Sequence, residues 1–121
     1  MNASQSVVAV VEAFNEAFNA HDVDAVMALM TTDCVFVGTV PPDGDRYVGA
    51  EEVRSAWESF FASSPTSAFT AEEMVAMSDR VVVRWRYDWT DGDGEAGHVR
   101  GIDLFRIVDG LVAEKFAYVK G

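Results

Sequence analysis

The 121-residue sequence predicts a single α+β domain, residues 1–121, in which three N-terminal helices pack on one face of a strongly curved antiparallel sheet. Two observations support this fold class. In the first half of the chain, apolar residues recur mostly at helical spacing, whereas from residue 68 onward apolar and polar residues alternate between turn signals. A twisted meander with helices on one side tends to curl into a cone, and the space between the two layers then forms a pocket.

Each predicted helix carries one apolar stripe with spacings of three and four residues. Residues 19–22 separate the first helix from the second, and Asp22 is a suitable N-cap for the second. Gly49 opens the third helix, and the run Ser63-Ser64-Pro65 ends it. The stripes are Val7, Val11, Phe14 and Phe18; Val23, Val26, Met27 and Met30; and Val53, Trp57, Phe60 and Phe61.

The strands follow from alternation and from turn residues. A short strand at Cys34–Val37 is followed by the proline-rich turn 41–45 and a short extended piece at Tyr47-Val48. Asp109-Gly110 is a strong hairpin signal between the last two strands. The four strands of the meander are predicted at residues 68–77, 81–90, 98–108 and 111–119.

The charge balance excludes some classes of partner. Twenty acidic residues against nine basic ones give a formal net charge of −11, and such a surface repels phosphate backbones. No apolar run approaches the roughly 20 residues that span a bilayer, and the start MNASQS lacks the basic residues and apolar stretch of a signal peptide. We therefore expect no nucleic-acid partner, no membrane association and a cytoplasmic location.

The sequence offers no metal or cofactor motif. Cys34 is the only cysteine, which excludes an internal disulfide and a cysteine-rich metal site. His21 falls in a loop and His98 at the start of a strand, and neither has a second ligand at metal-binding spacing. The chain also lacks a glycine-rich phosphate loop.

One carboxylate stands out of pattern. Asp103 lies on the same strand face as Phe105 and Ile107 by period two, although strands disfavour aspartate on an apolar face. Burial would raise its pKa, so that it would persist as a neutral acid and donate a hydrogen bond to a ligand oxygen. The alternative is an Asp103 satisfied by the backbone or by a lysine at the edge of the pocket.

Four segments together resemble the nuclear transport factor 2-like superfamily, and especially its SnoaL-like polyketide cyclases and ketosteroid isomerases. They are AFNAHDVDAVMALMTTDCVF (17–36), YVGAEEVRSAWESFF (47–61), DRVVVRWRYDW (79–89) and RGIDLFRIVDGLVAEKFAYV (100–119). The resemblance implies a cone of three helices and a curved sheet, which is usually dimeric through the outer face of the sheet. The pockets of this superfamily serve isomerases, cyclases, hydrolases, dehydratases and binding modules, so the fold alone does not select an activity.

The resemblance to ketosteroid isomerase is incomplete. Asp103 aligns with the oxyanion-hole aspartate of that enzyme. The position of its oxyanion-hole tyrosine is Phe14, which has no hydroxyl, and the position of its catalytic base is Gly38, which has no carboxylate. Without the base there is no group to move the proton, so steroid isomerisation is disfavoured.

Aromatic residues and one lysine are the predicted ligand contacts. Large rings facing the concave side would form a stacking surface for a ring-shaped ligand, although several of them can equally be core. Lys115 aligns with an inward position and would pair with Asp103; alternatively, it lies on the exposed face or is shifted by a bulge. The predicted ligand-binding residues are Phe14, Tyr47, Trp57, Trp85, Tyr87, Trp89 and Lys115.

These residues leave three functions open. The first is proton transfer or cyclisation on a small hydrophobic carbonyl or enol compound, with Asp103 as the acid. The second is binding of such a molecule without turnover, and the third is a protein–protein adaptor that uses the outer sheet face. On that face the apolar Ile102 and Leu104 lie among Arg84, Arg86 and Arg106, a mixture that predicts a homodimer interface.

Overall fold

The computed structural model describes residues 2–121 and contains three helices and six strands in the predicted order. The elements are α1 (Ala3–Asn19), α2 (Val23–Ala28), β1 (Met30–Val37), β2 (Arg46–Val48), α3 (Ala50–Ser63), β3 (Ala68–Met77), β4 (Arg80–Thr90), β5 (Ala96–Val108) and β6 (Leu111–Val119).

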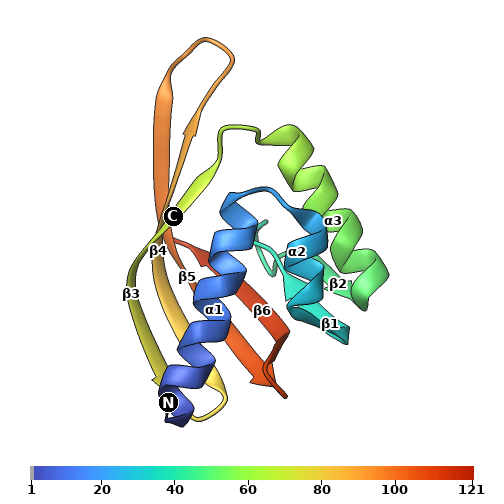
Figure 1. Ribbon diagram of the computed structural model, residues 1–121. Helices are drawn as coiled ribbons and strands as arrows, with labels where there is room; N and C mark the ends of the chain where they lie inside the picture. Colours follow the sequence, from blue (N-terminus) through green and yellow to red (C-terminus); the bar gives the residue numbers. More distant parts are fainter. Residues whose placement is uncertain (1) are drawn as a thin grey trace.

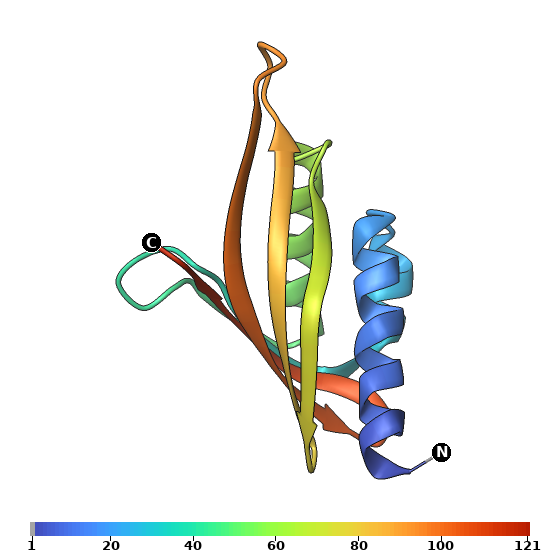
Figure 2. The same cartoon turned by 90° about the vertical axis from the view of Figure 1, so that its left-hand side faces the viewer.

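All six strands form one sheet in the order β2-β1-β6-β5-β4-β3. Neighbouring strands are antiparallel except β1 and β6, which are parallel. The sheet curves strongly, the helices lie on its concave side, and the β4–β5 hairpin extends beyond them (Figures 1 and 2). The predicted α+β fold class is confirmed.

Local side-chain contacts define where the helices begin. Asn2 and Gln5 form a reciprocal capping box at the start of α1, and the Asp22 carboxylate accepts the backbone N–H of Ala25 at the start of α2. Gly49 precedes α3 with a φ of 91°, a conformation that glycine adopts without steric cost.

The first strand is longer than the sequence pattern predicts. Met30 was expected on the apolar stripe of α2, but that helix ends at Ala28 and Met30 begins β1. The Leu29 carbonyl accepts a hydrogen bond from the backbone N–H of Val112, which is remote in sequence. This non-local bond draws the chain into the sheet earlier than the local periodicity indicates.

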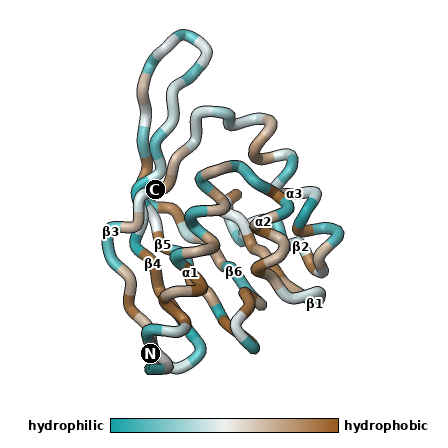
Figure 3. The backbone as a smooth tube through the Cα atoms, viewed as in Figure 1, coloured by the Kyte–Doolittle hydropathy of each residue, from teal (hydrophilic) through white to brown (hydrophobic). Residues whose placement is uncertain are grey.

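The core fills the space between α1, α3 and the concave face of the sheet. Phe14, Trp57, Val83 and Phe105 are almost completely buried there. In Figure 3 the brown stretches of α1 lie next to those of the sheet, whereas the tip of the β4–β5 hairpin is white and teal. The predicted alternation on β5 is confirmed, because Asp103, Phe105 and Ile107 all face this core.

Candidate functional site

Asp103 and Lys115 form a buried ion pair on the concave face. Lys115 Nζ lies 3.4 Å from Asp103 Oδ2, and only 5% of Asp103 and 6% of Lys115 is exposed. Lys115 is the register partner of Phe105, two residues from Asp103 on β5, so the two charged side chains are diagonal neighbours on one face. The expectation that Lys115 lies on the exposed face is therefore wrong, and the pairing with Asp103 holds.

A β-bulge brings Lys115 to this face. Ile107 pairs with Val112, but Arg106 pairs with Glu114, so Ala113 is an extra residue in β6. If the same sequence were paired without a bulge, Ala113 would lie opposite Arg106, Glu114 would face the core and Lys115 would face outward. With it, the Glu114 carboxylate lies on the outer face and accepts a hydrogen bond of 2.6 Å from Arg106 Nε.

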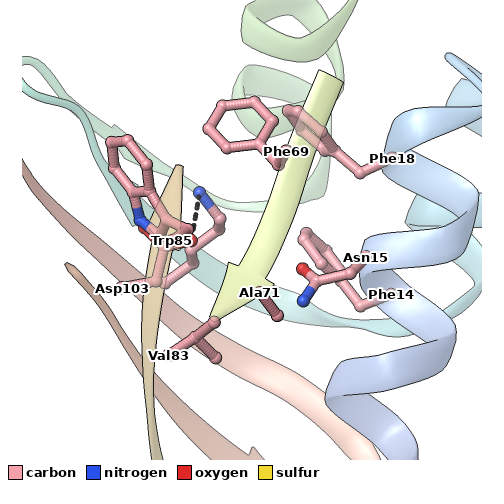
Figure 4. Close-up of a pocket in the computed structure, with 9 residues that line it drawn as sticks. Phe14, Asn15, Phe18, Phe69, Ala71, Val83, Trp85 and Asp103 are labelled. Atoms are coloured by element: carbon pink, nitrogen blue, oxygen red, sulfur yellow. Dashed lines mark ion pairs between the residues drawn. The ribbon is translucent and has the colours of Figure 1, made fainter. Parts of the chain in front are cut away.

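The surroundings of Asp103 favour its neutral form. Burial raises the pKa of its carboxyl group, while the positive charge of Lys115 and the nearby indole N–H of Trp85 act in the opposite direction. Its Oδ1 atom is buried without a hydrogen-bond partner among the described residues. Figure 4 shows Trp85 beside Asp103 and the ion pair as a dashed line. A proton on this carboxyl group is thus favoured by desolvation.

Three aromatic rings surround the ammonium group of Lys115. Its Nζ lies 5.6 Å from the ring centroid of Phe18, 5.1 Å from that of Phe36 and 5.5 Å from that of Trp57. Cation–π contacts at these distances offset part of the cost of removing the ammonium from water. The amine is therefore held in place by rings on three elements.

The pair lies at the wall of a cavity of about 400 Å³ between α3 and the sheet. This volume falls in the range of small-molecule pockets, which begins at about 300 Å³. A second space beside α1 measures only about 10 Å³, too small for an organic ligand. Besides Asp103 and Lys115, the larger cavity is lined mainly by Phe18, Phe36, Tyr47, Trp57, Phe60, Phe69, Trp85, Tyr87 and Val99.

The cavity brings together most of the predicted ligand-binding residues. Its lining includes Tyr47, Trp57, Trp85 and Tyr87 with Lys115, which come from β2, α3, β4 and β6. The pattern that placed Trp85 and Tyr87 on the concave face therefore also places them in a hollow of ligand size.

Two predicted ligand-binding residues lie elsewhere. Phe14 is fully buried, packs edge-on against Phe105 and borders only the small space beside α1. Trp89 lies farther along β4 and lines a separate shallow groove near the hairpin. Trp89 shares a strand face with Trp85, but the groove that it lines lies between residues 63–65 at the end of α3 and residues 91–92 of the hairpin. Neither side chain lines the cavity that contains Asp103.

Four phenylalanines of the cavity, Phe18, Phe36, Phe60 and Phe69, were not among the predicted site residues. Phe36 stacks on Tyr47 with ring centroids 5.7 Å apart and lies opposite Lys115 in the parallel β1–β6 register. Phe69 lies between Phe18 and Tyr87, and Phe60 follows from the apolar stripe of α3. The apolar stripes that contain Phe18 and Phe60 were visible in the sequence, whereas the position of Phe36 depends on the non-local β1–β6 pairing.

Gly38 and Phe14, the two positions at which the chain departs from ketosteroid isomerase, have different surroundings. Gly38 borders the cavity, and a Cβ added there would meet no atom closer than 3.6 Å, which is an ordinary contact. Phe14 is part of the core. The catalytic-base position is therefore open space at the cavity wall, whereas the tyrosine position is filled by packing.

Within residues 2–121 no group of three or more His, Cys, Asp or Glu side chains is arranged to hold a metal ion. His21 stacks on Phe61 and shares a hydrogen bond of 3.1 Å with the hydroxyl of Ser67. In the same part of the chain, no helix is both long and apolar enough to cross a membrane.

Comparison with solved structures gives relatives over the whole chain. An NTF2-like protein of unknown function from Mesorhizobium loti is 37% identical over 100% of this chain and 96% of its own, with a TM-score of 0.82. A putative SnoaL-like polyketide cyclase from Jannaschia sp. CCS1 is 20% identical over 99% of this chain and 89% of its own, with a TM-score of 0.85. TerC, co-crystallised with polyporic acid, is 16% identical over 95% of this chain and 92% of its own, with a TM-score of 0.82.

The family assignment rests on the sequence as well. No curated protein sequence matches the chain. The model of the SnoaL-like domain matches residues 11–115, which include β1, the Asp103 strand and Lys115. The chain therefore belongs to the SnoaL-like family of the nuclear transport factor 2-like superfamily.

Proposed function

We propose that this protein binds a small hydrophobic molecule carrying a carbonyl or enol oxygen, and that it catalyses proton transfer or ring closure on it. The observation that carries the proposal is the buried Asp103–Lys115 pair at the wall of an aromatic-lined cavity of about 400 Å³. A buried ion pair adds little to stability compared with an apolar pair, so its presence beside a cavity favours a chemical role.

The two side chains have complementary roles in this proposal. Asp103, kept neutral by burial, donates a hydrogen bond or a proton to the ligand oxygen as negative charge develops there. The Lys115 ammonium stabilises the same charge electrostatically. The flat faces of Trp57, Phe69 and Tyr87 hold the ligand ring and exclude water.

Relatives of the same fold agree with this class of ligand. One solved structure is a putative polyketide cyclase from Xanthomonas campestris, and TerC was co-crystallised with polyporic acid. Both are similar to this chain at 20% identity or less, so they support a pocket for planar oxygenated rings without specifying the compound.

Binding of polyporic acid and of naphthol, followed by quenching of tryptophan fluorescence, tests the proposal. Both probes are expected to bind the wild-type protein, and Asp103→Asn and Lys115→Met should each weaken binding by about tenfold, equivalent to one charge-assisted hydrogen bond. The matched control is Asp93→Asn, which removes a carboxylate at the exposed β4–β5 hairpin. Equal affinities of wild type and both site variants would contradict the proposal.

Binding without turnover is the second candidate, and Gly38 favours it, because the position aligned with the isomerase base carries no side chain. The distinguishing result is exchange of the acidic hydrogens of a bound ketone with deuterated water. Exchange that depends on Asp103 indicates catalysis, and binding without exchange indicates a binding module. The adaptor function is disfavoured by the cavity, since a cone filled by its own side chains was expected for it.

A further inference from the structure

We infer that Lys115 is a nucleophilic amine that condenses with an aldehyde or ketone carbonyl of a molecule in this cavity to form an imine. The inference rests on the proposed function only in using the same cavity. It adds a covalent step that hydrogen bonding to a ligand oxygen does not require.

The choice of lysine at this position is the first argument. The chain has two lysines, Lys115 and Lys120, and Lys120 is exposed near the C-terminus. Among residues 2–121, every ion pair apart from Lys115–Asp103 uses arginine as its cation. Arginine keeps its proton in proteins, whereas a lysine amine can lose it and become a nucleophile. Among these ion pairs, the pair at the cavity is therefore the one whose cation can lose its proton.

The environment of the amine is the second argument. Lys115 is almost fully buried among Phe18, Phe36 and Trp57, and within residues 2–121 its only ion-pair partner is Asp103. Transfer of one proton from Nζ to Oδ2, across 3.4 Å, converts two buried charges into a neutral amine and a neutral acid. The raised pKa of Asp103 favours this transfer. A lysine desolvated in a hydrophobic pocket is one of the arrangements that activate an amine for imine chemistry.

The reaction is complete with these two groups. The amine lone pair attacks the carbonyl carbon, the C=O electron pair moves to oxygen, and that oxygen takes the proton of Asp103. The Asp103 carboxylate then accepts a proton from the nitrogen and returns it to the hydroxyl group. Water leaves as the nitrogen lone pair forms the C=N bond, and the protonated imine gives its remaining N–H proton to the Asp103 carboxylate, which restores the neutral acid. The sum is amine plus carbonyl to imine plus water, with no oxidant or reductant.

The cavity has room for the carbonyl compound next to the amine. Lys115 and Asp103 both line the space of about 400 Å³, together with Trp57 and Phe36, which also contact Nζ. A flat aromatic carbonyl compound can therefore stack on these rings while its carbonyl carbon meets the amine. The geometry selects planar aryl aldehydes and ketones as the substrate class.

Reductive trapping on the intact protein tests the inference. The protein is incubated with naphthaldehyde and sodium cyanoborohydride, and the modified lysines are mapped by mass spectrometry. Lys115 is expected to be alkylated at least about tenfold faster than Lys120, although it is much less exposed. Naphthol, which fills the cavity without forming an imine, should protect Lys115 and leave the labelling of Lys120 unchanged. These measurements need only the wild-type protein.

Variants then assign the chemistry. Lys115→Arg keeps the positive charge but should abolish labelling at this position, and Lys120→Arg should leave the labelling of Lys115 unchanged. Asp103→Asn should slow the labelling of Lys115 by about tenfold or more, because the proton donor is lost. Labelling of Lys115 at or below the rate of Lys120 would overturn the inference. If naphthol and polyporic acid still bind in that case, the proposed function stands without the covalent step; if they do not bind, both fail.

Discussion

The indole ring of Trp85 lies against Gly101 on the neighbouring strand, where the two residues are register partners. A methyl group at Gly101 would collide with the Trp85 ring and with the backbone carbonyl oxygen of Tyr118. The same relationship recurs at the hairpin, where Trp89 lies against Gly97. Glycine is required at both positions because only a bare backbone leaves room for the indole.

Gly101→Ala is therefore expected to displace Trp85 from the cavity wall. The free energy of unfolding should fall by about 2 kcal/mol, a usual cost of overpacking, and the affinity for naphthol should fall with it. Urea unfolding and fluorescence titration measure the two effects. In Gly97→Ala the new methyl group meets only Trp89, which does not line the cavity, so this control should bind naphthol normally.

The Asp103–Lys115 pair predicts a strongly non-additive double-mutant cycle. Asp103→Leu alone leaves the buried Lys115 amine without its acidic partner, and we expect a loss of about 3 kcal/mol in the free energy of unfolding. Lys115→Met alone leaves Asp103 without its partner, whereas the double variant removes both groups and should recover most of the loss. Urea unfolding of the two single variants and the double variant measures the coupling. Additive losses would show that the pair does not interact.

Asp103 also predicts an unusual pH dependence. Burial raises the pKa of its carboxyl group against the opposing effects of Lys115 and Trp85, so the folded chain holds this proton more tightly than the unfolded chain. Its contribution to stability is then present below the ordinary aspartate pKa of about 4 and is lost as the pH rises through the higher value of the folded state. The stability of wild type relative to Asp103→Asn should fall with rising pH over this interval. The other ionisable groups that line the cavity are present in both proteins; they are Asp45, Tyr47, Tyr87 and Lys115. A relative stability that increases with pH would contradict the assignment.

The outer sheet face predicts a homodimer, which we propose as the assembly of this protein. An apolar patch covers β3 to β6, and five of the seven arginines lie on β4 and β5 beside it, in a chain with a net charge of −11. These arginines form ion pairs with neighbouring carboxylates, so this face repels a second copy less than the net charge of the chain suggests. The outer patch consists of Val75, Val82, Ile102, Leu104, Phe116 and Tyr118.

Light scattering should therefore give twice the chain mass of 13.2 kDa at micromolar concentration. Ile102→Glu is expected to produce a monomer, because it places a charge at the centre of the outer patch. Val40→Glu is the matched control, since Val40 is also an exposed apolar residue but lies in the loop between β1 and β2. A monomeric wild type would contradict the proposed assembly.

The open space at Gly38 predicts that a carboxylate can be introduced at the position that aligns with the catalytic base of ketosteroid isomerase. A side chain at this position meets the ring of Phe36 at an ordinary contact distance, so Gly38→Asp should fold with little loss of stability. It would place an acid at the wall of the cavity that holds Asp103. Deuterium exchange into a bound ketone should rise by about a hundredfold, the lower end of general-base contributions. Gly38→Asn is the control with nearly the same volume, and it should show no gain.

The elements and the inward position of Asp103 were predictable because they depend on local periodicity. Asp103 shares a face with Phe105 in any regular strand, so its burial follows from period two alone. The orientation of Lys115 was not predictable, because it depends on the extra residue Ala113, which leaves no local signal. The separation of Trp89 from Trp85 was equally hidden, since it depends on where α3 ends relative to the sheet. The aromatic lining from β1 required the non-local pairing of Phe36 with Lys115.

The bulge at Ala113 places two successive residues of β6, Val112 and Ala113, on the core side. Deleting Ala113 would leave Val112 opposite Ile107, Glu114 opposite Arg106 and Lys115 opposite Phe105, so the strand would become regular and Lys115 would stay beside Asp103. One residue inserted between Glu114 and Lys115 would instead turn the lysine to the outer face. A change of one residue in chain length thus keeps or removes the acid–amine centre according to where in β6 it falls.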